Sequence, residues 1–204
     1  MSTASLLGQI EAFVSGQLSG CNEQLAYHNL NHTLSVVENA SQITDYYQLT
    51  DANRFVVLAA SWFHDLAYVN GNPSGHEQRG VSIFHEFANN LLIEGDIIAR
   101  VTNCILATAL PQRPTNLLES IVCDADLYHF GTTEFAEKDA LMLKETQHRV
   151  ETGIAWPTWL AGSIKLLRSH QFCTPYCQDK LAGQKQENLR QLEARIQVTS
   201  EANQ

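Results

Sequence analysis

Helical periodicity runs along almost the whole chain and limits what it can fold into. Apolar residues recur at spacings of three and four in one segment after another, the pattern of helices that bury one face. Glycine, proline and capping residues separate these segments, and we find no strand-like alternation. The sequence therefore predicts an all-α fold in a single domain over residues 1–204. The expected helices, about nine, cover residues 3–18, 31–49, 51–69, 76–92, 95–106, 117–126, 134–151, 156–167 and 175–198.

Composition restricts the partners of this chain. Its 204 residues are 44% apolar, which is enough for one domain with a substantial core. Thirteen Lys and Arg face 22 Asp and Glu, so the formal net charge is −9. Such a surface repels a polyphosphate backbone, which argues against bulk nucleic acid as a partner. A small phosphorylated substrate in a local cationic pocket remains compatible.

Cysteine usage and hydropathy indicate the compartment. The number of cysteines is odd and no Cys-x-x-Cys pair occurs, so we expect reduced thiols of a cytoplasmic protein. We see no secretory signal at the N-terminus and no run of about 20 apolar residues that would span a membrane. The five thiols are Cys21, Cys104, Cys123, Cys173 and Cys177.

A His-Asp pair, His64 and Asp65, ends the most apolar of the predicted helices. Asp51 is the expected N-cap of that helix, and the turn-forming residues 70–73 are its expected stop. Two ionisable side chains near the end of a core helix need partners, because burying them alone costs several kcal/mol. In the simplest alternative, His64 donates to a backbone carbonyl and Asp65 makes a surface salt bridge.

Two other segments offer matching donors. His32 lies in Tyr-His-Asn-Leu-Asn-His upstream of the pair, and Asp124 and Asp126 lie in Cys-Asp-Ala-Asp-Leu downstream. Each segment stands at the edge of another predicted helix. Imidazole and carboxylate together suit Mn, Mg, Fe, Co, Ni or Zn. We therefore expect a divalent metal ion, of undetermined identity, to be bound by nitrogen and oxygen ligands.

The order of these motifs resembles the HD superfamily of metal-dependent phosphohydrolases, whose pattern is H…HD…D. Tyr-His-Asn-x-x-His, Trp-Phe-His-Asp and Asp-Ala-Asp-Leu are most similar to its compact, single-domain branch of predicted HD phosphohydrolases. The resemblance covers residues 25–130 and extends only loosely over the C-terminal helices, residues 133–198. It implies that the metal ligands are His32, His64, Asp65 and Asp126, and that Asp124 caps or braces.

The function implied by the resemblance is hydrolysis of a phosphate ester by metal-activated water. The protein would be a phosphatase or phosphodiesterase that acts on a small phosphorylated metabolite, with a nucleotide as our first choice. The alternative is a non-catalytic, nucleotide-binding HD module that regulates rather than hydrolyses. Similar chains often read Thr-x-His-His before the last Asp, whereas Thr108 here is followed by Ala-Leu-Pro. With those histidines absent, we expect one metal ion rather than two.

Three further residues are candidates for catalysis. His28, four residues before His32, could orient a ligand, contact phosphate or bind a second ion, or could simply cap a helix beneath Tyr27. Glu77 matches a glutamate of similar proteins and could relay a proton, although Gly80 and its neighbour replace an expected Ser-Ala. Lys144 resembles a basic residue at this place in similar chains and could bind phosphate, or could lie on a solvated helix face.

The sequence also gives an expectation for Asp65→Ala. Loss of this carboxylate should abolish metal binding and leave the protein folded. Without metal, the variant should gain stability, because ligand carboxylates that are clustered repel one another.

Overall fold

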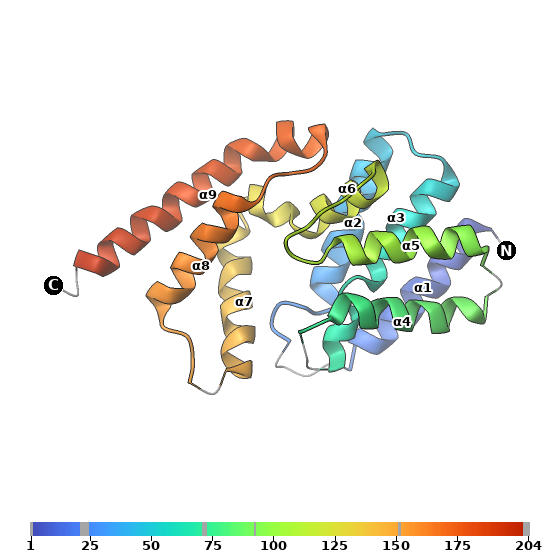
Figure 1. The fold of residues 1–204 in the computed structure, drawn as a ribbon, viewed down its shortest axis with the longest axis horizontal. Helices are drawn as coiled ribbons and strands as arrows, with labels where there is room; N and C mark the ends of the chain where they lie inside the picture. The colour runs from blue at the N-terminus through green and yellow to red at the C-terminus, as the bar shows by residue number, and fades with distance from the viewer. Residues whose placement is uncertain (1, 21–24, 71–72, 92, 151, 202–204) are drawn as a thin grey trace. The chain divides into compact units, whose positions relative to one another are not determined.

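The computed structural model describes residues 2–20, 25–70, 73–91, 93–150 and 152–201. Within these ranges the chain is all-α, with nine α-helices, two short 3-10 helices and no strand, which confirms the predicted fold class (Figure 1). The helices are α1 (Thr3–Leu18), α2 (Leu30–Tyr46), α3 (Asp51–Phe63), η1 (Leu66–Asn70), α4 (His76–Asn89), α5 (Gly95–Ala107), α6 (Leu117–Asp126), η2 (Tyr128–Gly131), α7 (Phe135–Arg149), α8 (Trp156–Ser169) and α9 (Pro175–Glu201).

The helices form two compact units, Met1–Asp126 and Leu127–Gln204. The first contains α1 to α6 with η1, and the second contains η2 and α7 to α9. A single domain over residues 1–204 therefore stays a prediction. No helix in the described part of the chain combines the length and the apolar character needed to cross a membrane. Cys104, Cys123, Cys173 and Cys177 are free thiols, whereas Cys21 lies outside the described residues.

Helix α3 is the most buried helix of the first unit. Every residue from Phe55 to Phe63 is buried, and the helix packs against α1, α2, α4, α5 and α6. Its N-cap is Thr50, whose hydroxyl accepts from the Asn53 amide, so the prediction of Asp51 as the cap was wrong. Thr50 has the extended backbone that a cap requires, whereas Asp51 is already helical.

The end of α3 differs from the prediction in a way that matters for the site. The α-helix ends at Phe63, with His64 as its C-cap, and the chain continues into η1 from Leu66. The expected helix over residues 51–69 is therefore two helices. His64 and Asp65 lie where the first gives way to the second, so two adjacent residues are both buried at a change of backbone geometry.

Side-chain caps fix the starts of α2 and α6. Asn29 accepts from the amides of Asn31 and His32, which places His32 in the first turn of α2. Asn116 accepts from the Glu119 amide, and the Glu119 carboxylate in turn accepts from the Thr115 amide, hydroxyl and neighbouring side chain. This reciprocal capping anchors the start of the helix whose last residue is Asp126.

In the second unit, α9 packs against α8 and against η2. The Asn188 amide donates to the carbonyls of Phe130 and Thr132, which ties α9 to the segment around η2. The Asp139 carboxylate accepts from the Trp159 indole at 3.0 Å and from the Ser163 hydroxyl at 2.6 Å, which ties α7 to α8. These side-chain hydrogen bonds connect the helices within the second unit.

Candidate metal centre

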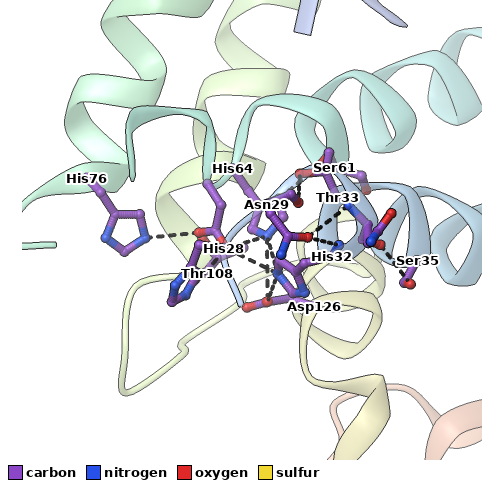
Figure 2. Close-up of polar contacts among 12 residues, drawn as sticks. His28, Asn29, His32, Thr33, Ser35, Ser61, His64, His76, Thr108 and Asp126 are labelled. Atoms are coloured by element: carbon purple, nitrogen blue, oxygen red, sulfur yellow. Dashed lines mark hydrogen bonds and ion pairs between the residues drawn. The ribbon is translucent and has the colours of Figure 1, made fainter. Parts of the chain in front are cut away.

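Four side chains from three separate helices of the first unit meet at one point. His32 comes from the first turn of α2, His64 and Asp65 from the end of α3, and Asp126 from the last position of α6. One nitrogen or oxygen of each lies within 4.8 Å of the corresponding atom of the others. Figure 2 shows His32, His64 and Asp126 converging between the ends of their helices.

The spacing of these atoms suits one metal ion. The Nε2 atoms of His32 and His64 are 3.3 Å apart. Each lies 3.1 Å from Asp65 Oδ2 and 3.6 Å from Asp126 Oδ1. Metal–ligand bonds of about 2.0–2.2 Å place neighbouring ligand atoms roughly 3.0–3.6 Å apart. The donor set therefore has the chemistry and the dimensions of a single divalent site, while the role of the four residues as ligands stays a prediction.

The orientation of His64 follows from a backbone contact. Its Nδ1 lies 2.8 Å from the Ser61 carbonyl oxygen, which can only accept, so Nδ1 carries the hydrogen. In the neutral ring, Nε2 then turns a lone pair toward the cluster, as a metal ligand requires. The simplest alternative for His64 was that it only donates to a backbone carbonyl. That hydrogen bond is present, and it also turns Nε2 toward the cluster. Asp65 is only 8% exposed, and its ion pairs among the described residues are with four histidines, none of them exposed.

Burial and mutual charge determine the protonation of the metal-free cluster. Burial lowers the pKa of His32, against the opposing effect of Asp65. Burial also acts to lower the pKa of His64, but the carboxylates of Asp65 and Asp126 outweigh it and raise that pKa well above its ordinary value. For Asp65, burial acts to raise the pKa, but charged His64 and the hydrogen bonds from three histidines hold it well below its usual range. Asp65 is thus the anionic centre of the group.

Two more histidines, His28 and His76, surround Asp65. His76 Nε2 lies 3.2 Å from Asp65 Oδ1, and His28 Nε2 lies 3.9 Å from Asp65 Oδ2. Tyr68 separates the two imidazoles, with its ring centroid 3.7 Å from that of His28 in a stacked contact and 4.3 Å from that of His76. His28 precedes the cap Asn29 and so does not share a face of α2 with His32. Its ring meets Tyr27 edge-on, but the cap of α2 is Asn29 and not His28, so the capping alternative was wrong.

Sequence reasoning missed two residues that contact the carboxylates of the cluster. One is His76, the first residue of α4, whose place directly before Glu77 was the sole local signal. The other is Gln112, in the loop between α5 and α6, whose amide nitrogen donates to Asp126 Oδ2 at 3.1 Å. Asp124 is fully buried and does not belong to the four-residue cluster, whereas Asp126 does.

Comparison with known proteins gives the family. A profile of the HD domain matches residues 29–131, which is half of the chain and includes all four cluster residues. The chain belongs to the HD superfamily. HD proteins are generally metal-dependent phosphohydrolases that bind divalent ions, and the His/Asp cluster of this chain could hold such an ion. Searches of curated proteins and of solved structures gave no match.

The remaining catalytic candidates of this HD protein lie in different units. Glu77 follows His76 in α4, and its Oε1 lies 3.5 Å from Nε2 of His76, the histidine that contacts Asp65. Lys144 belongs to the second unit, where its side chain is exposed on α7. The catalytic roles of His28, Glu77 and Lys144 stay predictions.

Formal charge is divided unequally between the two units of the HD protein. Residues 1–126 contain 13 Asp and Glu but only four Arg and no Lys, which gives −9. Residues 127–204 contain nine of each sign and are neutral overall. Of the four arginines, Arg54 pairs with Asp45 and Arg100 with Asp96. The unit that holds the cluster therefore favours a cation and offers few positive charges to a phosphate.

Proposed function

We propose that this HD protein is a metal-dependent phosphohydrolase that acts on a small phosphorylated metabolite, with a nucleotide as the first choice. The observation that carries the proposal is the convergence of His32, His64, Asp65 and Asp126 inside a matched HD domain. Family membership alone gives the reaction class. The convergence supports the proposal because it brings two imidazoles and two carboxylates to one place where a divalent ion could bind.

The four cluster residues would hold one divalent ion, with Mn, Mg, Fe, Co, Ni and Zn all compatible with two imidazoles and two carboxylates. A bound divalent ion lowers the pKa of its water from about 15.7 toward 7 and polarises the phosphoryl group. The surrounding residues fix the orientation and the environment of the side chains that would hold the ion. The Ser61 carbonyl fixes the tautomer of His64, and the burial of the cluster keeps bulk water from weakening its electrostatic interactions.

The substrate must bring its negative charge to an acidic unit. With a formal charge of −9 in residues 1–126, phosphate would be repelled unless the ion and added cations offset that charge. This argues for a compact phosphorylated substrate rather than a polyanionic chain. Lys144 stays the candidate phosphate contact on the strength of the resemblance alone.

Metal analysis of the purified protein, followed by a hydrolysis screen, tests the proposal. The protein should contain close to one divalent ion per chain or take one up. With Mn or Co it should hydrolyse at least one member of a panel of nucleotides and other phosphomonoesters and diesters. Tight nucleotide binding without turnover would instead support the regulatory module. Failure to bind any divalent ion would contradict both functions.

Glu77→Gln should slow turnover without removing the ion. If Glu77 relays a proton, its loss should lower kcat about 10²–10⁴-fold, because the amide cannot exchange a proton with the reacting group. Metal content should stay at the wild-type value, since Glu77 lies outside the four-residue cluster. Steady-state kinetics with metal analysis measures both quantities. Glu86→Gln, on the exposed face of the same helix, is the matched control, and equal kcat values for the two variants would remove Glu77 from the mechanism.

Lys144→Gln should weaken substrate binding more than it slows chemistry. A lysine that only offsets the charge of a bound phosphate contributes to ground state and transition state alike, so KM should rise several-fold with kcat nearly unchanged. Lys165→Gln, an exposed lysine on α8, is the control for general charge effects. A KM that rises equally in both variants, or in neither, would assign Lys144 to the solvated helix face.

A further inference from the structure

Each carboxylate of the cluster has one oxygen turned inward and the other bonded outward. Asp65 Oδ2 faces His32 and His64 at 3.1 Å, while its Oδ1 lies 3.2 Å from His76 Nε2. Asp126 repeats the arrangement, because its Oδ1 faces both cluster histidines and its Oδ2 accepts from the Gln112 amide at 3.1 Å. Two unrelated segments, the start of α4 and the loop before α6, thus make the same kind of contact.

We propose that His76 and Gln112 are positioning residues that make Asp65 and Asp126 each present a single oxygen to the metal ion. The proposal rests on the proposed function for the presence of the ion and goes beyond it in assigning these two residues. A free carboxylate rotates easily about its last torsion and can bind an ion through one oxygen or two. A donor that holds one oxygen removes that freedom, and such partners of ligands tune metal affinity.

His76 is held firmly enough to do this. Its Nδ1 lies 2.8 Å from the Pro73 carbonyl oxygen, which can only accept, and its ring packs on Tyr68. Both ring nitrogens therefore face oxygen acceptors. Figure 2 shows the His76 ring reaching toward the cluster from the start of its own helix.

Gly80, one turn further along α4, permits this reach. A Cβ at Gly80 would lie 2.9 Å from the Phe63 carbonyl oxygen and 3.5 Å from that of His64. Contacts under 3.0 Å are not tolerated, so glycine allows α4 to lie directly against the end of α3. Gly80, which replaces an expected serine, thus allows the close packing that places His76 next to Asp65.

Gln112 reaches Asp126 from the loop that joins α5 to α6. This loop, residues 108–116, contains no histidine that could bind metal itself. Its contribution is an amide that donates to the outer oxygen of Asp126, from a half-buried side chain. The loop therefore supports the last ligand of the cluster without adding a donor atom to it.

Titration of the metal-free full-length protein with Co²⁺, followed by calorimetry and by the visible spectrum of the bound ion, tests the assignment. His76→Leu and Gln112→Leu should each weaken binding about 10–100-fold, the usual effect of losing a partner of a ligand. The Co²⁺ spectrum should also change, because a released carboxylate alters the coordination. His76→Gln, which keeps a donor of similar reach, should stay within a few-fold of wild type. His85→Leu, the same substitution on the exposed face of α4, is the matched control and should bind normally.

The outcomes separate the two proposals. Wild-type protein that binds no Co²⁺ overturns the proposed function. Wild-type binding with unchanged affinity and spectrum in both leucine variants overturns the positioning roles alone. Equal losses in His76→Gln and His76→Leu would also overturn the role of His76, because the hydrogen bond would then not be the cause. If His76→Leu fails to fold, the comparison of His76→Gln with wild type still tests the role of His76. A His76→Gln protein that folds but binds Co²⁺ about 10–100-fold more weakly would overturn that role.

Discussion

Asp65→Ala should abolish metal binding and hydrolysis together. Asp65 contributes the oxygen that lies 3.1 Å from both cluster histidines, and it carries the negative charge at the centre of the group. If Asp65 is a metal ligand as proposed, its loss should lower metal affinity by far more than the roughly 10–100-fold cost of losing a partner of a ligand. Calorimetric titration with Mn²⁺ or Co²⁺ measures the affinity, and turnover at saturating metal measures the chemistry.

The structure reverses the expected effect of this substitution on stability. Sequence reasoning predicted a gain for the metal-free protein, on the argument that ligand carboxylates repel one another. In the folded chain, however, Asp65 is surrounded by imidazoles, with His32, His64 and His76 all within 3.2 Å. Loss of the carboxylate leaves buried donors without their acceptor, at a cost of about 1–3 kcal/mol. The metal-free variant should therefore unfold at a lower temperature than the metal-free wild type.

Asp96→Ala is the control for this experiment. Asp96 is exposed in the first turn of α5 and pairs with Arg100 four residues on, an interaction worth a few tenths of a kcal/mol. It should leave metal binding and turnover unchanged. An Asp65→Ala protein that retained full metal content and full activity would exclude this cluster as the catalytic centre.

The sequence could predict those parts of the site that depend on local patterns of residues. His32, His64, Asp65 and Asp126 each end or begin an apolar helical segment, and such segments bring their ends into a common core. Resemblance to the HD pattern then selected them among other polar residues. The same patterns predicted the all-α class, because the spacing of apolar residues and the Gly, Pro and capping residues between helices can be read directly from the sequence.

The parts that sequence could not predict depend on contacts between segments. Nothing next to Gln112 indicates that its amide bonds Asp126, since that contact exists only once the loop folds over the end of α6. His76 was visible as the start of a helix, but its approach to Asp65 depends on how closely α4 packs against α3. The end of α3 at Phe63 also escaped prediction, because apolar periodicity continues into η1.

Gly131→Ala should be the most destabilising glycine substitution in the second unit. Gly131 ends η2, and a Cβ built there would lie 2.4 Å from Leu181 Cβ and 2.7 Å from the Leu181 carbonyl oxygen. A rotamer change of Leu181 cannot move its Cβ or its carbonyl oxygen, so α9 would have to shift as a whole. Overpacking of this kind costs about 1–3 kcal/mol or more, which lowers the unfolding temperature by several degrees. Thermal unfolding followed by circular dichroism measures the effect.

Gly183→Ala is the matched experiment on the same helix, with the opposite expected sign. Gly183 lies within α9, exposed, and a Cβ there would meet nothing within 4 Å. Alanine removes the entropic cost of glycine in a helix and should stabilise by up to about 1 kcal/mol. If alanine at 131 were tolerated as well as alanine at 183, η2 could not approach α9 as closely as the structure has it. If alanine lowers stability at 131 and raises it at 183, the close contact between η2 and α9 is the cause of the loss, and not the helix α9 itself.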